Sequence, residues 1–213
     1  MKNNYTHVSI LIDRSGSMAS IRKSVMSGLE EFINDQKTLD GDCTLSIVAF
    51  NHTKEYISSF VDLKTYEFDP NQYQPSGTTA LVDSMYEFIK ETGQHLAKMS
   101  EDERPSKVVF LVITDGEENA SKQFTNEQLK ELVIEHTDIW KWNFTYIGAN
   151  QDSFAVSKTL GISTSSTINY NTTINGVSNI FTLTSGKLKG YRSGNSKTLS
   201  YTSDEQEYSE KLK

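Results

Sequence analysis

Apolar runs of strand length alternate with amphipathic helical stretches along most of this chain, and that alternation constrains the fold more than any other feature. The run at 107–114 (KVVFLVIT) and the shorter run at 8–12 are continuously apolar. Such strands have two buried faces and are typical of a parallel sheet with helices on both sides. Residues 21–33 repeat apolar side chains every three or four positions, which indicates a helix between two strands.

The same rhythm continues through most of the chain. Further strands are expected at 44–50, 55–63, 143–148 and 164–170, and further helices at 81–99, 125–140, 152–159 and 177–188. The short polar link before residue 55 predicts an antiparallel hairpin at that point. The fold class expected is therefore α/β: a doubly wound, mostly parallel, Rossmann-like sheet with one antiparallel edge strand and helices on both faces.

A single domain is expected for residues 1–192, because the alternation is unbroken there and no internal repeat is present. Residues 193–213 lose the apolar periodicity and are predicted to form a polar, flexible C-terminal tail. Within the domain, residues 148–152 (GANQD) are interpreted as a tight turn, with Asp152 capping the helix that follows.

Composition excludes several classes of function. The net charge of −7 and the lack of a basic stripe argue against nucleic acid as a partner. The sequence has no run of about 18 apolar residues and no secretion signal, so a cytoplasmic protein without a membrane span is expected. The single cysteine, Cys43, lies beside an apolar run and is interpreted as a core residue.

Three loops bring oxygen-bearing side chains to one edge of the predicted sheet. Asp13, Ser15 and Ser17 (DRSGS) follow the first strand, and Asp115 follows the strand at 107–114. The loop at 76–79 (SGTT) precedes a long helix. Ligands of doubly wound sheets bind beyond the carboxyl ends of the strands, so these loops are expected to share one rim.

The side chains at this rim predict a metal site. Carboxylates and hydroxyls are hard ligands that suit Mg²⁺, Mn²⁺ or Ca²⁺ rather than zinc or copper. Alternate residues of an extended turn point the same way, so Asp13, Ser15 and Ser17 can converge on one ion. Two aspartates just balance a divalent charge, and an ion held in part through water would accept a carboxylate from outside.

These motifs resemble the metal-ion-dependent adhesion site of von Willebrand factor A (VWA) domains, of the stand-alone bacterial or phage type. The family's Asp-x-Ser-x-Ser loop is matched by Asp13, Ser15 and Ser17, and its last aspartate by Asp115. Its threonine is matched by Thr78, with Thr79 as the rival. The resemblance covers about residues 5 to 170 and implies a metal site of Asp13, Ser15, Ser17, Thr78 and Asp115.

The resemblance implies a non-enzymatic module that binds the carboxylate of a protein partner through its divalent ion. An alternative is a Mg²⁺-dependent phosphotransfer or hydrolase enzyme, which the absence of a phosphate-binding G-x-x-x-x-G-K-[ST] loop disfavours. A third hypothesis is a structural component of a phage particle or a self-assembling complex. In that case the metal site would meet a neighbouring copy, so a homo-oligomer stays open.

Overall fold

Six strands form one sheet in the order β3-β2-β1-β4-β5-β6, in a computed structural model that describes residues 1–149 and 152–211. Neighbouring strands are parallel except for β2 and β3, which are antiparallel. The strands are β1 (Lys2–Asp13), β2 (Asp42–Phe50), β3 (Lys54–Asp62), β4 (Pro105–Thr114), β5 (Asn143–Gly148) and β6 (Thr167–Asn169). The predicted mostly parallel sheet with one antiparallel edge strand is confirmed.

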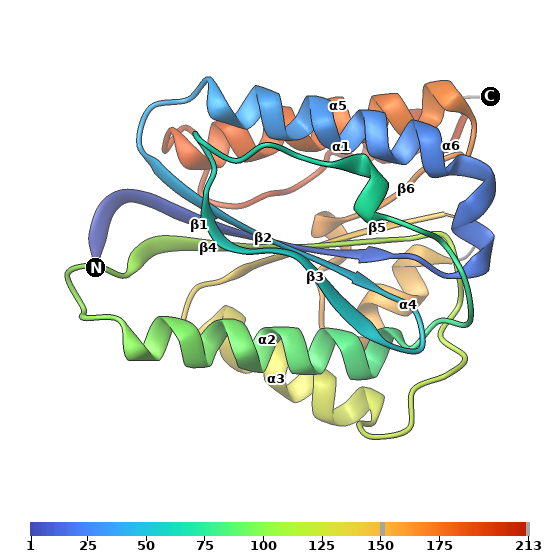
Figure 1. Ribbon diagram of the computed structural model, residues 1–213, viewed down its shortest axis with the longest axis horizontal. Coiled ribbons are helices and arrows are strands. Elements are labelled where there is room, and N and C mark those ends of the chain that lie inside the picture. Colours follow the sequence, from blue (N-terminus) through green and yellow to red (C-terminus); the bar gives the residue numbers. More distant parts are fainter. Residues whose placement is uncertain (150–151, 212–213) are drawn as a thin grey trace.

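Helices cover both faces of this sheet (Figure 1). One face carries α1, α5 and α6, and the other carries α2, α3 and α4. In the described part of the chain the α-helices are α1 (Arg22–Lys37), α2 (Leu81–Lys98), α3 (Asn126–Asp138), α4 (Ser153–Thr159), α5 (Ile174–Arg192) and α6 (Ser203–Lys211). Short 3₁₀ helices are η1 (Gly16–Ile21), η2 (Pro70–Gln72) and η3 (Thr164–Ser166).

Each face of the sheet has its own apolar core, because successive side chains of a strand point to opposite faces. In β1, Ile10 and Ile12 belong to the core under α1 and α5, whereas Leu11 belongs to the core under α2 and α3. Leu111 and Val112 of β4 divide in the same way. All five side chains are at most 1% exposed, so the two central strands are buried on both faces.

The order of the strands reverses between β1 and β4. β1 pairs with β2 on one side and with β4 on the other. The chain first forms β1, β2 and β3 on one side, and then β4, β5 and β6 on the other. In doubly wound sheets the ligand site lies at this point, beyond the carboxyl ends of the strands. The loops after Asp13 and Thr114 lie there, since those residues end β1 and β4.

Some boundaries differ from the predicted ones. β1 begins at Lys2 rather than at residue 8, because Lys2 pairs with Pro105 of β4 and Tyr5 pairs with Asp42 of β2. The Asp152 side chain caps α4 as predicted, accepting a hydrogen bond from Ala155 N at 3.0 Å. Residues 150 and 151 of that predicted turn lie outside the described part of the chain.

The C-terminal segment differs from the expected polar tail. Leu199 and Tyr201 are 1% and 5% exposed and belong to the core under α1 and α5. The Tyr201 hydroxyl lies 2.9 Å from Thr184 Oγ1, and Ser166 Oγ donates to Leu199 O at 2.8 Å. Residues 203–211 then form α6. The sequence did not predict this packing, because Leu199 and Tyr201 alone are too few to give a periodic apolar pattern. Residues 212–213 lie outside the described range.

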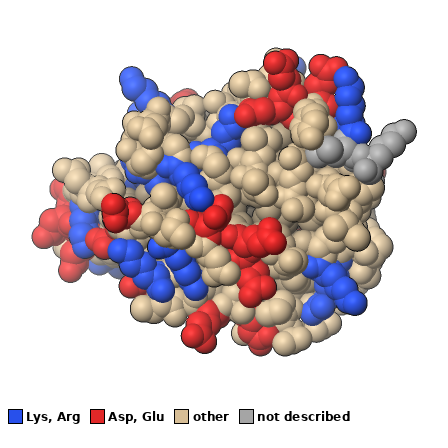
Figure 2. Space-filling view, turned by 90° about the horizontal axis from the view of Figure 1, so that it is seen from above, with Lys and Arg blue, Asp and Glu red and all other residues tan. Residues whose placement is uncertain are grey.

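Charged side chains of both signs intermingle on the face covered by α1, α5 and α6 (Figure 2). Ion pairs connect the helices here: Lys189 lies 3.0 Å from Asp35 of α1, and Lys187 lies 2.7 Å from Glu205 of α6. The described residues of this face show no basic stripe of the kind that binds nucleic acid. In the described part of the chain, no helix combines the length and the apolar character that a membrane span requires.

The side chain of His7 is buried on the face of the sheet that α2 covers. His7 Nδ1 lies 2.9 Å from Thr44 Oγ1, and its Nε2 lies 3.1 Å from Ser9 Oγ. Its ring stacks on Phe60 at 3.9 Å between centroids, and Phe60 stacks in turn on His95 at 3.6 Å. Burial, with a smaller effect of His95, lowers the pKa of His7 to about 3. His7 is therefore neutral in the folded protein near neutral pH.

This histidine predicts a loss of stability in mild acid. Below about pH 6.5 the unfolded chain binds a proton at His7 that the folded protein does not bind, so the free energy of unfolding falls. Between about pH 7.5 and pH 5 the contribution of His7 is about 2 kcal/mol. Urea unfolding at both pH values should show a loss smaller by that amount in His7→Gln than in the wild type. An identical pH dependence in both proteins would contradict the prediction.

The packed C-terminal segment gives a second prediction. Leu199→Ala removes a side chain from the core and should lower the free energy of unfolding by about 2–4 kcal/mol. Tyr208→Ala in α6 is the matched control, because Tyr208 is 58% exposed, and its effect should stay within about 0.5 kcal/mol. Chemical denaturation measures both. Equal small effects would show that residues 193–211 contribute little to the fold.

Candidate metal centre

Asp13 ends β1 and lies at the centre of the rim. Its side chain is 0% exposed. Oδ1 accepts a hydrogen bond from Ser15 N at 2.7 Å, and Oδ2 accepts one from Thr114 Oγ1 at 2.6 Å. The hydroxyl of Tyr73 donates to the main-chain oxygen of Asp13. Neutral donors from three different segments therefore fix this residue, two of them at its carboxylate, and none of these bonds neutralises its charge.

The two serines connect Asp13 to the second carboxylate. Ser15 Oγ lies 3.0 Å from Ser17 Oγ, and Ser17 Oγ donates to Asp115 Oδ1 at 2.6 Å. Ser15 and Asp115 are buried, whereas Ser17 is exposed at the start of η1. The structure thus brings four of the five predicted residues into one hydrogen-bonded chain that reaches the surface at Ser17.

The threonine loop is hydrogen-bonded to both of the other loops. Gly16 N donates to Gly77 O at 3.0 Å, which joins the first loop to the second. Thr79 N donates to Asn119 Oδ1 at 3.0 Å, and Asn119 N returns a bond to Thr79 O at 3.0 Å. Gly77 has a φ of +78°, and a Cβ there would lie 2.7 Å from His52 Nδ1. The loop therefore depends on glycine at this position.

The two adjacent threonines have different surroundings. Thr78 is exposed, whereas Thr79 is 2% exposed. A Cβ placed on Gly116 would lie 3.3 Å from Thr79 Oγ1, 3.4 Å from Ser17 Oγ and 3.5 Å from Asp13 Oδ2. Side-chain oxygens from two of the three loops thus lie close to a single point beside the main chain of the third loop at Gly116, and Thr79 supplies the hydroxyl from the threonine loop.

Burial dominates the electrostatics of this rim. It raises the pKa of Asp13, although the bonds from Thr114 and Ser15 oppose the effect, and nearby Asp115 raises it further. Burial also raises the pKa of Asp115, against the bond from Ser17. The pKa values of Tyr73 and Tyr170 are raised by burial and by both carboxylates. A cation at the rim would favour the ionised form of both aspartates.

Two further carboxylates hold the loop at 115–124 rather than face the rim. Glu118 accepts bonds from Val82 N at 2.9 Å and from the main-chain N of Ala120 and Ser121 at 2.8 Å each. Asp83 accepts main-chain bonds from residues 122, 123 and 124. Both carboxylates therefore anchor this loop, and Asp83 also lies in the first turn of α2.

In residues 1–149 and 152–211, no group of three or more His, Cys, Asp or Glu side chains could hold a metal ion. This excludes sites rich in imidazole or thiolate from that part of the chain. The rim at Asp13 differs in kind, since only two of its oxygen donors are carboxylates.

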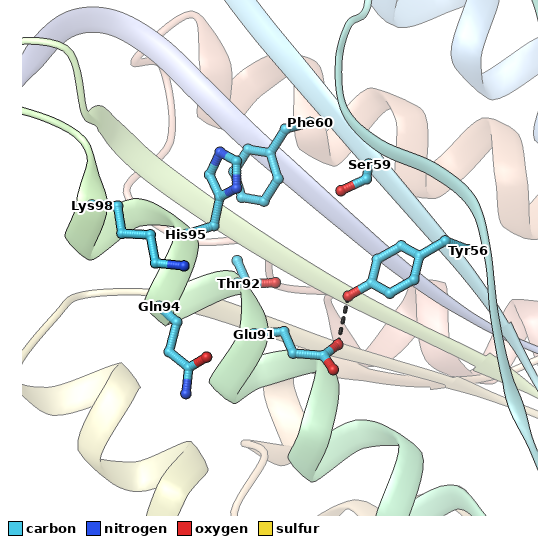
Figure 3. A pocket seen from close by; sticks show the side chains of 8 residues that line it. All are labelled: Tyr56, Ser59, Phe60, Glu91, Thr92, Gln94, His95 and Lys98. Atoms are coloured by element: carbon cyan, nitrogen blue, oxygen red, sulfur yellow. Dashed lines mark hydrogen bonds between the residues drawn. The ribbon is translucent and has the colours of Figure 1, made fainter.

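A separate hollow lies between β3 and α2, with a volume of about 260 Å³ (Figure 3). Tyr56 and Phe60 come from β3, and Glu91 and His95 from α2. The Tyr56 hydroxyl donates to Glu91 Oε2 at 2.6 Å, and Lys54 Nζ lies 2.7 Å from the same oxygen. The carboxylate of Glu91 is therefore already paired. None of the residues that converge on the rim lines this hollow.

Known structures share this arrangement of sheet and helices. Proximal thread matrix protein 1 from the mussel byssus matches with a TM-score of 0.61 and 14% identity, over 87% of this chain and 46% of that chain. A von Willebrand factor type A structure from Catenulispora acidiphila matches with a TM-score of 0.61 and 12% identity, over 87% and 43%. The chain has the von Willebrand factor A fold.

A third solved structure with this fold is the mussel protein with zinc in its metal-ion-dependent adhesion site (MIDAS) motif. It matches with a TM-score of 0.59 and 14% identity, over 87% of this chain and 46% of that chain. The present chain spans less than half the length of these solved chains. No protein-family description and no curated protein sequence matches it. The likeness therefore lies in the fold.

The loop anchors give a prediction that separates structure from metal binding. Glu118→Ala leaves three main-chain donors without their acceptor and should lower the free energy of unfolding by about 2–3 kcal/mol. Its neighbour Glu117 is exposed, so Glu117→Ala is a matched control with an effect within about 0.5 kcal/mol. Thermal and urea unfolding in EDTA measure both without a contribution from metal. If Glu118→Ala were as stable as Glu117→Ala, the loop would not depend on this carboxylate.

Proposed function

We propose that this protein is a non-enzymatic binding module that engages a carboxylate of a protein partner through a bound divalent cation. Asp13, Ser15, Ser17 and Asp115 would hold the ion, with one hydroxyl from the threonine loop. The observation that carries the proposal is the convergence of three side-chain oxygens, each from a different residue, within 3.3–3.5 Å of one point beside Gly116. A cation is the species that such a group of oxygen donors would stabilise.

The donor set also indicates what the ion would do. Two carboxylates balance a divalent charge, and the hydroxyls add none, so the ion keeps its attraction for a further anion. Asp13 already accepts bonds from Ser15 N and Thr114, which favours contact with the ion through water. An aspartate or glutamate of a partner would then complete the coordination. Hard oxygen donors favour Mg²⁺, with Mn²⁺ and Ca²⁺ as the other candidates.

For the threonine we propose Thr79 in place of Thr78, the residue that the resemblance to the family favoured. Thr79 is buried and directs Oγ1 to the same point as Ser17 and Asp13. Thr78 is exposed at the tip of the loop, where it could contact a partner. The main chain of Thr79 is bonded to Asn119 in both directions, which holds its hydroxyl in place.

The mussel protein of the same fold that was solved with zinc in its MIDAS motif supports a divalent cation at this rim. An enzyme is the weaker hypothesis, because the sequence has no phosphate-binding glycine–lysine loop. A structural role in a phage particle or another assembly would use the same metal site against a neighbouring copy. We also propose a cytoplasmic location, with which the free thiol of Cys43 is compatible.

Calorimetric titration with Mg²⁺, Mn²⁺, Ca²⁺ and Zn²⁺ tests the site. Asp115→Ala and Asp13→Ala should abolish binding, because each removes half of the balancing charge. Ser15→Ala should only weaken it. Thr79→Val should weaken binding roughly tenfold, the size of effect expected when one supporting group of a metal site is lost. Thr78→Val is the matched control and should bind like the wild type.

Gly116→Ala provides an independent arm of the same titration. The added methyl would occupy the point where the oxygens converge, so metal binding should be lost while unfolding in EDTA stays nearly unchanged. If Asp115→Ala bound Mg²⁺ as tightly as the wild type, the site would be misassigned. The partner is then sought by capture from the native host in Mg²⁺ and in EDTA, and size-exclusion chromatography under both conditions detects metal-dependent self-association.

A further inference from the structure

A second groove lies beside the amino-terminal half of β5, with a volume of about 480 Å³. Its walls come from α3, from β5 and from the connection between α4 and β6. Among the residues that line it are Lys130, Ile134, Trp142, Phe144, Lys158 and Ile162. The amino ends of parallel strands lie opposite their carboxyl ends. This groove is therefore at the opposite end of the strands from Asp13 and Asp115.

The groove exists because the last strand of the sheet is short. β6 pairs only with Tyr146, Ile147 and Gly148, the final three residues of β5. Before β6 the chain turns away through η3, so no described strand lies outside Asn143 and Phe144. The Asn143 side chain accepts a weak bond from Leu199 N at 3.4 Å, and the space between that contact and α3 is left open.

The lining combines buried apolar side chains with two lysines. Trp142, Phe144 and Ile162 are 4–6% exposed, and Ile134 of α3 is 41% exposed. Lys130 and Lys158 are the only charged residues among those that line the groove, although the chain as a whole carries a net charge of −7. Neither lysine makes an ion pair among the described residues.

We propose that this groove binds a small organic anion with an apolar body, of the class of single-chain carboxylates. Its volume lies within the range of about 300–1,000 Å³ that is usual for small-molecule sites, and it combines apolar walls with a few polar groups as such sites do. The apolar chain would lie on Trp142, Phe144 and Ile162. The carboxylate would meet the ammonium groups of Lys130 and Lys158, whose charge is otherwise unbalanced in the groove.

Tryptophan fluorescence with decanoate as the probe tests this proposal. The chain has two tryptophans, and Trp140 is 60% exposed, so a Trp140→Phe background leaves Trp142 in the groove as the single reporter. Decanoate below its aggregation concentration should change this fluorescence saturably, with a dissociation constant of about 1 mM or tighter. Decanol and decyltrimethylammonium have the same chain with a neutral or a positive head group, and both should bind at least about tenfold more weakly.

Charge variants identify the site. Lys130→Ala combined with Lys158→Ala should weaken decanoate binding about tenfold and bring it close to the affinity for decanol. Lys23→Ala combined with Lys64→Ala removes the same charge from exposed positions outside the groove and should leave the affinity unchanged. Circular dichroism and thermal unfolding verify that each variant is folded.

Several results would overturn the proposal. The absence of a saturable change at Trp142 would do so, as would decanol binding as tightly as decanoate. An equal loss in both double-lysine variants would show a general effect of net charge. Self-association in sedimentation experiments that Ile134→Ser abolishes would mean that a second copy of the chain fills the groove. None of these outcomes depends on the metal site, so they are distinguishable from failure of the proposed adhesion function.

Discussion

The hydrogen bond between Asp13 and Thr114 joins the ends of the two central strands, and the candidate metal centre is built on it. β1 and β4 are adjacent because both are apolar on two faces and take the buried middle of the sheet. Their adjacency brings Asp13 and Asp115 to the same rim at a separation of about one hundred residues along the chain. Apolar burial thus determines where the charged groups meet.

Once the aspartates have met, the surrounding loops are fixed by main-chain hydrogen bonds to side-chain oxygens. Glu118 and Asp83 hold the loop after β4, and Asn119 holds Thr79. Such bonds satisfy donors that would otherwise be buried without partners, and they limit the movement of the rim before any ligand arrives. Preorganisation of this kind lowers the entropy cost of binding an ion. The cost is that Asp13 and Asp115 are buried together and neither forms an ion pair with a cationic side chain of the described residues. Burial therefore raises the pKa of each.

The sheet could be predicted from the sequence because its strands have strong local signals. A continuous apolar run at 107–114 has few alternatives to a central strand, and the hairpin at 44–63 follows from a short polar link. The oxygen-rich loops could be recognised because Asp13, Ser15 and Ser17 alternate beyond the end of such a strand. Their meeting with Asp115 follows from the topology alone, since parallel strands share one carboxyl edge.

Other features could not be predicted because they depend on contacts distant in sequence. Thr78 and Thr79 are chemically identical neighbours, and only the bonds from Asn119 and the left-handed Gly77 determine which hydroxyl turns inward. Leu199 and Tyr201 stand in a polar stretch, and their burial depends on contacts with Ser166 and Thr184. The groove beside β5 exists because β6 ends after three residues, a length that no local pattern determined.

The acidic side chains show why composition alone says little about this chain. A surplus of carboxylates suggests only solubility and a poor affinity for nucleic acid. In the structure the carboxylates differ in their hydrogen-bond donors. Asp83 and Glu118 each accept bonds from the main-chain N–H groups of three other residues, whereas the bond that Asp115 accepts from another residue comes from the Ser17 hydroxyl. A carboxylate satisfied by the main chain has little left to offer a ligand. Asp115 retains acceptor capacity at the rim, so under the proposed function it is the residue on which metal binding would depend most.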